Sequence, residues 1–166
     1  MKNRLSGLTF CLALGTAIIF TLPFNVIPGM AQTIADLSVS KNWIRATPPA
    51  AMVGGGYLVI SNSGSHDDTL TAAEFTGAKK TEIHEMKIKD GVMKMRPLKD
   101  GIKIPAGGTI VLKPGGFHLM FMGLKSRLKD GQNFPIKLTF ANAGETIVNF
   151  PVLTMEKGKK LMMPEN

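Results

Sequence analysis

Cysteine is almost absent from this chain of 166 residues, in which Cys11 is the only one. Disulfide frameworks, thiol redox catalysis, cysteine nucleophiles and cysteine-ligated zinc or iron–sulfur clusters all need thiols. Cys11 lies in an N-terminal segment with the features of a cleavable signal, so the exported chain has no cysteine. The exported chain therefore excludes these classes, and its fold must be stabilised by an ordinary hydrophobic core. A chain of this length can supply such a core.

Long runs of like charge are also missing. Lysine and arginine outnumber aspartate and glutamate by 20 to 12, which gives a net charge of +8, but the lysines are spread along the chain. Nucleic-acid binding usually needs cations gathered in a tract or patch, so this spread argues against it. With 44% hydrophobic residues and no low-complexity tract, the composition predicts one folded domain.

The only long apolar run is Leu8–Phe20, near the N-terminus. It follows two basic residues and precedes small residues at the −3 and −1 positions before Gln32, as in a cleavable secretory signal. An uncleaved membrane anchor would need about 20 apolar residues, and Pro23 and Asn25 interrupt this run. We therefore predict that residues 1–31 are a signal peptide, which leaves an exported chain of 135 residues with no cysteine, nine methionines and a net charge of +6.

Short segments rich in Val, Ile, Leu, Thr and Phe recur between turn signals after residue 36, and none shows sustained helical periodicity. The Asp90-Gly91 pair predicts a tight hairpin, and Asn142–Gly144 predicts another. With no room for crossover helices, we expect antiparallel strands in two packed sheets and a frayed, solvated tail over 155–166. The predicted strands are Leu37–Ala46, Gly56–Ser61, Asp68–Glu74, Thr81–Lys89, Gly91–Pro97, Thr109–Lys113, His118–Leu124, Phe134–Ala141 and Thr146–Leu153.

Histidine and methionine stand out among the residues that can carry chemistry. Residues two apart share a strand face, so His118, Met120 and Met122 lie opposite the apolar Phe/Leu face of the same strand. His84 and Met86 show the same spacing, and Met93 and Met95 also share a face. Thioethers with imidazoles suit Cu(I), whereas zinc, magnesium and calcium prefer other donors.

An alternative interpretation needs no metal, because methionine also fills irregular gaps in a core and histidines can lie at strand ends incidentally. The metal-free interpretation is the simpler one for Met52, Met155, Met162 and Met163. It also remains open for the methionines beside His84 and His118. His66, within a polar Ser-His-Asp-Asp loop, is interpreted as part of a solvated turn.

The ordered series of histidines and methionines resembles the signature of the PCuAC-type periplasmic copper chaperones. His84 is followed after ten residues by Met95, and after twenty-two more by the His118-Leu119-Met120 triplet. The resemblance covers nearly the whole exported chain. The matching stretches are Trp43–Pro49, Gly55–Leu58, Glu82–Met86, Asp90–Pro97, Ile104–Gly108 and Leu112–Leu124.

This resemblance implies a cupredoxin-like, Greek-key β-sandwich that binds one Cu(I) near its surface and passes it to a copper enzyme in the periplasm. The ligands it implies are His84, Met95, His118 and Met120, and Met86, Met93 and Met122 would be alternative ligands or a gate. The acceptor it implies is the copper A centre of cytochrome c oxidase, with or without a thiol-bearing assembly factor. Some relatives have a histidine-containing tail with a second copper site, but this tail has no histidine.

Other classes fit the sequence less well. A blue-copper electron carrier needs a cysteine thiolate, and the sequence has no G-x-S-x-G or H-E-x-x-H motif of a hydrolase. An exported copper storage or tolerance protein, or a non-metal interaction module with a methionine-rich face, remains an alternative. We expect a monomer that is not an enzyme and that meets acidic partners through its positive charge.

Overall fold

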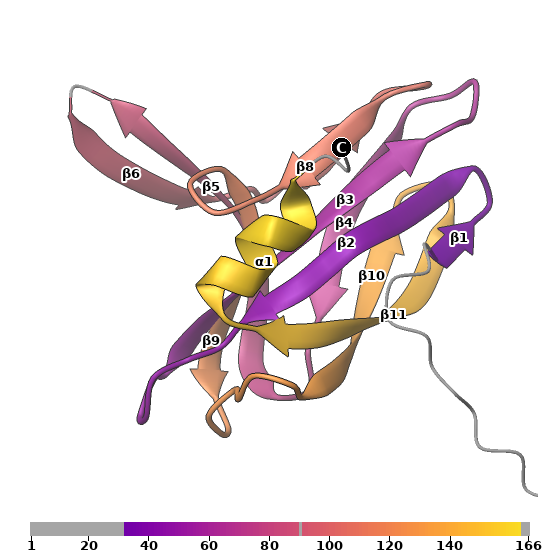
Figure 1. The fold of residues 1–166 in the computed structure, drawn as a ribbon. Helices are drawn as coiled ribbons and strands as arrows, with labels where there is room; N and C mark the ends of the chain where they lie inside the picture. The colour runs from indigo at the N-terminus through magenta and orange to yellow at the C-terminus, as the bar shows by residue number, and fades with distance from the viewer. Residues whose placement is uncertain (1–31, 90, 164–166) are drawn as a thin grey trace, which may run out of the picture.

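The computed structural model describes residues 32–89 and 91–163, so the predicted signal peptide and residues 164–166 lie outside the described residues. Eleven strands and one helix follow each other along the chain (Figure 1). The strands are β1 (Gln32–Ile34), β2 (Leu37–Arg45), β3 (Val53–Asn62), β4 (Asp68–Glu74), β5 (Ala78–Lys89), β6 (Val92–Pro97), β7 (Ile102–Ile104), β8 (Thr109–Leu112), β9 (Phe117–Leu124), β10 (Asn133–Phe140) and β11 (Gly144–Leu153), and the helix is α1 (Met155–Met162).

The strands form one continuous path in the order β6-β5-β9-β3-β2-β11-β10-β4-β7, with β1 added to β2 and β8 added to β3. The path folds back on itself at β11, whose C-terminal end pairs with β2 while its length pairs with β10. In Figure 1, β4 and β10 therefore lie behind β2 and β3, so the two layers make a β-sandwich. This confirms the all-β, sandwich-type fold.

The core between the layers is built from the strand faces that alternate towards it. Leu119 and Phe121 of β9 are fully buried, and the ring of Phe75 packs edge-on against Phe121 at 4.9 Å between centroids. Burying such side chains contributes about 1.5–3 kcal/mol each. The apolar face assigned to β9 from the sequence is thus confirmed, and the opposite face carries the histidine and methionines.

Two predictions about the architecture were wrong. The pairing is not wholly antiparallel, because β11 meets β2 in parallel at Val152 and Leu153. The short strands β1 and β7 were also missed, since three residues give no readable alternation of hydrophobic and polar side chains.

The predicted frayed tail is instead the helix α1 over most of its length. Thr154 caps it by accepting a hydrogen bond from the Lys157 N–H. Gly158 faces the fully buried Trp43, where a Cβ atom would stand 2.3 Å from the indole ring. The close contact needs a glycine, which weakens helix propensity, so the helix depends on packing that a local sequence pattern does not show. No helix within residues 32–89 and 91–163 is long and apolar enough to cross a membrane.

Candidate metal centre

Three neighbouring strands bring the predicted ligands to one face of the sheet. β5 pairs with β9 so that His84 lies opposite His118, and it pairs on its other side with β6 so that Met86 lies opposite Met95. Met120 follows His118 by two residues and therefore shares its face. The strand register thus gathers residues that are up to 36 positions apart in the sequence.

The two histidines are in direct contact. Their ring centroids are 5.8 Å apart and the rings meet at 62°. Both side chains are buried, with residue exposures of 8% for His84 and 5% for His118. Buried imidazoles normally have their polar atoms satisfied by hydrogen bonds, so the bonds of each ring nitrogen decide which atoms are left for a ligand.

His118 leaves Nε2 available. Its Nδ1 lies 3.0 Å from the carbonyl oxygen of Gly116, and because a carbonyl only accepts, Nδ1 carries the proton and Nε2 keeps its lone pair. Burial lowers the pKa of His118 and the neighbouring His84 lowers it further, although the bond to Gly116 acts in the opposite direction. The ring is therefore neutral at neutral pH, which is the state that coordinates a metal.

His84 leaves the other ring nitrogen available. Its Nε2 donates to Glu82 Oε2 at 2.8 Å, which places the proton on Nε2. Its Nδ1 is buried and has no hydrogen-bond partner among the described residues. In metal-binding histidines, a carboxylate usually accepts a hydrogen bond from the ring nitrogen that does not bind the metal. The structure therefore leaves Nδ1 of His84 as the ring nitrogen that can bind a metal.

Glu82 is ionised in this arrangement. The hydrogen bond from Lys80, at 2.5 Å, and the bond from His84 lower its pKa. Glu82 was not among the predicted site residues. The signal that could have found it is its spacing, because a residue two before His84 lies on the same strand face.

The methionines line a cleft beside the histidines. This cleft has a volume of about 360 Å³ and contains His118, Met120, Met95 and Met86 among its lining residues, but not the buried His84. Gly55, which pairs with Met120 on the neighbouring strand, is also in the lining. The structure therefore places Met86 in the cleft with three of the four predicted ligands, and the fourth, His84, contacts His118 behind it.

Met93 and Met122 are not in the cleft lining. Met93 lies further along β6 with 63% of its surface exposed, and Met122 pairs with Lys80 and Val53 on the neighbouring strands. Met95 is at the cleft entrance, with 44% of its surface exposed. The arrangement offers Nε2 of His118, the buried Nδ1 of His84 and up to three thioethers, a donor set suited to a soft, low-charge ion such as Cu(I).

Residues 32–89 and 91–163 contain no group of three or more His, Cys, Asp or Glu placed to hold a metal ion. The buried Glu85, next to His84 in the sequence, points to the other face and is bound by Arg96 and Lys87 at 2.7 Å each. Glu85 is therefore a structural ion-pair partner.

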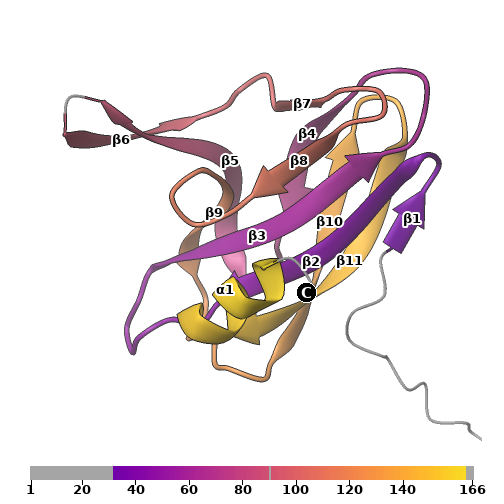
Figure 2. The same ribbon diagram turned by 45° about the horizontal axis from the view of Figure 1, so that its top comes forward.

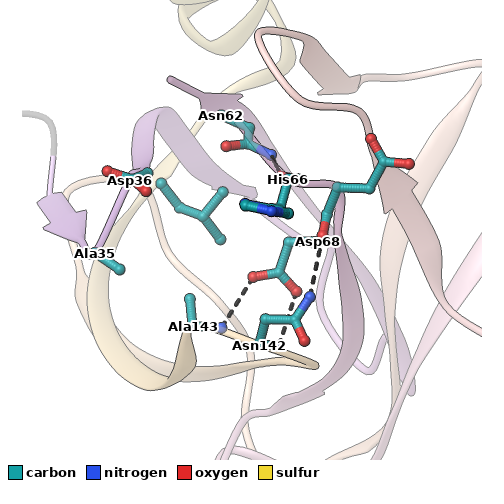
Figure 3. Close-up of a pocket in the computed structure, with 9 residues that line it drawn as sticks. Ala35, Asp36, Asn62, His66, Asp68, Asn142 and Ala143 are labelled. Atoms are coloured by element: carbon teal, nitrogen blue, oxygen red, sulfur yellow. Dashed lines mark hydrogen bonds between the residues drawn. The ribbon is translucent and has the colours of Figure 1, made fainter. Parts of the chain in front are cut away.

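A second cavity lies at the opposite ends of β2 and β3 (Figure 3). Its central group is Asp68, whose carboxylate accepts hydrogen bonds from the backbone N–H groups of Thr69, Asn142 and Ala143 at 2.7–3.0 Å. His66 is exposed and bonded to Ser65, as a solvated turn predicts. The central carboxylate of this cavity already accepts hydrogen bonds, and the lining contains no methionine or cysteine sulfur that could bind Cu(I).

Comparison with known proteins agrees with the fold. The family model "Putative lipoprotein LpqE-like" matches residues 37–152. The "Putative lipoprotein Lxx21020" of Leifsonia xyli subsp. xyli is 36% identical over 130 residues, which cover 76% of this chain and 77% of that protein.

Solved structures share the architecture. The copper-bound PCuAC domain from PmoF2 has a TM-score of 0.65 at 18% identity, covering 75% of this chain and 98% of that one. The Cu(I) form of DR1885 from Deinococcus radiodurans has a TM-score of 0.56 at 26% identity, covering 75% of this chain and 81% of that one. The chain therefore has the PCuAC fold and belongs to the LpqE-like family.

Proposed function

We propose that this protein is a Cu(I) metallochaperone, which holds one ion in the cleft and transfers it to a copper enzyme. The ligands are His84 through Nδ1, His118 through Nε2, and the thioethers of Met95 and Met120. The observation that carries the proposal is the Nδ1 of His84, buried and without a hydrogen-bond partner among the described residues, beside His118 and a thioether-lined cleft. The similarity to copper-bound PCuAC domains supports the choice of metal.

The ligand set suits transfer by ligand exchange. Imidazole and thioether are neutral donors, so the site adds no negative charge that would hold Cu(I) as thiolates do. Met95 is half-exposed on the edge strand β6, whereas both histidines are buried. An acceptor ligand can therefore replace Met95 first, while the histidines still hold the ion.

The setting of this activity follows from the sequence and the family. A thioether site suits an oxidising compartment because it cannot form disulfides, and the predicted signal peptide and the lipoprotein relatives support export to the periplasm. We propose the copper A centre of cytochrome c oxidase as the acceptor, directly or through a thiol-bearing assembly factor. A monomer with net positive charge would be steered to an acidic patch on that acceptor.

An anaerobic Cu(I) titration against a calibrated competing chelator tests the site. We expect one tight equivalent in the parent, and a loss of affinity of more than about 100-fold in His118→Ala, because a lost ligand costs more than a lost supporting hydrogen bond. Met120→Leu should weaken binding clearly, and Met163→Leu, an exposed methionine outside the cleft, should not.

Circular dichroism of each variant separates lost binding from lost folding. A folded parent that cannot compete for Cu(I) would contradict the proposal and favour a non-metal interaction module. A parent that binds Cu(I) but gives it to no copper enzyme would instead favour storage or tolerance.

A further inference from the structure

The β5–β6 hairpin extends beyond the body of the sandwich. β9 pairs with β5 only as far as Glu85, and the Met86 N–H makes a last backbone bond to Gly116. From Lys87 onward β5 pairs with β6 alone, so this part is a two-stranded ribbon (Figures 1 and 2). Such ribbons have little stability of their own, and both faces of this one are open to solvent.

One face of the ribbon is apolar and continues the metal cleft. Pairing places Met86 opposite Met95 and Ile88 opposite Met93, with all four side chains on one face. Ile88 is 74% exposed and Met93 is 63% exposed. Met52 and Val53, also at least half exposed, lie at the start of β3, where Val53 lines the same cleft. Most of the exposed large hydrophobic residues among those described thus surround the metal cleft, and clusters of this kind mark interaction sites.

The charges near this apolar surface are mainly positive. Arg45 is the only charged residue in the cleft lining, and Arg127 donates a hydrogen bond to the carbonyl of Thr47, a lining residue. The opposite face of the ribbon carries Lys87, Lys94 and Arg96, of which Lys87 and Arg96 pair with Glu85. A second copy of this chain would bring like charges together, and a flat bilayer cannot enter a concave cleft. A protein with an apolar contact surface and acidic residues fits best.

We propose that the ribbon face of Met86, Ile88, Met93 and Met95, with Met52 and Val53 across the cleft, is the docking surface for the copper-exchange partner. That partner presents an apolar surface around its own metal ligands and carboxylates towards Arg45, the charged residue in the cleft lining. Docking covers the exposed side chains and places the incoming ligands beside Met95. This inference rests on the proposed chaperone function.

The test measures the second-order rate of Cu(I) transfer to the apo copper A domain of cytochrome c oxidase. Ile88→Ser removes apolar surface without changing a proposed ligand. Val92→Ser is the matched control, because Val92 is also exposed, at 57%, but lies on the other face of the ribbon. We expect Ile88→Ser to transfer about 10-fold more slowly, while its Cu(I) affinity and its release to a small chelator stay at parental values. Val92→Ser should stay within twofold of the parent, and raising the salt concentration should slow the parent.

Each other outcome overturns the inference in a recognisable way. Equal transfer by Ile88→Ser and the parent would remove the ribbon from the docking surface while leaving the chaperone function intact. Binding of the parent to phosphatidylglycerol vesicles that Ile88→Ser abolishes would assign the face to a membrane, and a dimer that Ile88→Ser dissociates would assign it to self-association. A parent that binds Cu(I) but transfers none to this domain would overturn the proposed acceptor and the docking surface together.

Discussion

The two ends of strands β2 and β3 both bury charged or ionisable side chains, but they leave different numbers of hydrogen bonds unmade. At one end, both carboxylate oxygens of Asp68 accept backbone N–H groups (Figure 3). At the other end, one ring nitrogen of His84 is bonded to Glu82, and the other is buried and has no hydrogen-bond partner in the part of the chain that the structure describes. A buried polar group whose hydrogen bonds are all made stabilises a turn. A buried polar atom that lacks a hydrogen-bond partner and lies beside a cleft is a candidate for binding a ligand. The comparison predicts that substitutions at the two ends separate stability from metal binding.

The largest effect should come from His84→Leu. We expect Cu(I) affinity to fall by more than about 100-fold, because the variant lacks the Nδ1 donor. The free energy of unfolding should change by less than about 1 kcal/mol, because an apolar side chain replaces a group whose hydrogen bonding is incomplete. Chelator competition measures the Cu(I) affinity, and urea unfolding of the metal-free protein measures the stability. A large loss of stability with Cu(I) binding retained would contradict the assignment of His84 to metal binding.

Asp68→Asn should give the opposite result, with lower stability and unchanged Cu(I) affinity. An asparagine has one acceptor oxygen and places an NH₂ group where the second oxygen accepts from Ala143. We expect the free energy of unfolding to fall by about 2 kcal/mol, the range for hydrogen bonds to charged groups. Cu(I) affinity of the folded variant should equal that of the parent. Asp100→Asn, in an exposed loop, is the matched control.

The acid limb of the stability curve should depend on the same carboxylate. Burial acts to raise the pKa of Asp68, but the surrounding backbone N–H groups outweigh it, so the pKa is lowered in the folded state. The stabilisation is therefore fully present above the unfolded pKa of about 3.9 and is lost as the pH falls through the lower folded pKa. Urea unfolding between pH 7 and pH 2.5 should show a shallower acid loss in Asp68→Asn; parallel curves would show that Asp68 contributes none of it.

Glu82→Gln should have a smaller effect on copper. Glutamine can still accept from His84 Nε2, but without charge, so the ring is held less firmly in the tautomer that exposes Nδ1. We expect a loss of Cu(I) affinity of about 10-fold. Glu85→Gln is the control, since that carboxylate binds Arg96 and Lys87 on the other face. Equal affinities in the two variants would make Glu82 a surface ion-pair residue only.

The strands and the face that carries the site could be predicted from the sequence, because both depend on side chains that alternate between the two faces of a strand. The alternation in β9, with Leu119 and Phe121 on one face and His118 and Met120 on the other, is visible in the sequence, and the full burial of Leu119 and Phe121 confirms the core face. Features that depend on tertiary contacts were not visible. The helix α1 forms where Gly158 fits over Trp43, and the unbonded nitrogen of His84 depends on the rotamer that meets Glu82.

The ribbon was partly foreseen. The Asp90-Gly91 turn and the shared face of Met93 and Met95 indicated the hairpin, and the observed β5–β6 pairing agrees. Its extension past the end of β9 follows from the length of β5 relative to its neighbours, which a single sequence does not reveal.

Long-range ¹H–¹⁵N correlation spectra of the histidine rings, recorded before and after one equivalent of Cu(I), test the central claim most directly. We predict that the metal-free protein carries its ring protons on His84 Nε2 and His118 Nδ1. Cu(I) should then shift His84 Nδ1 and His118 Nε2, and leave the exposed His66 unchanged. Protons on the opposite nitrogens, or a copper-induced shift confined to His66, would contradict the account.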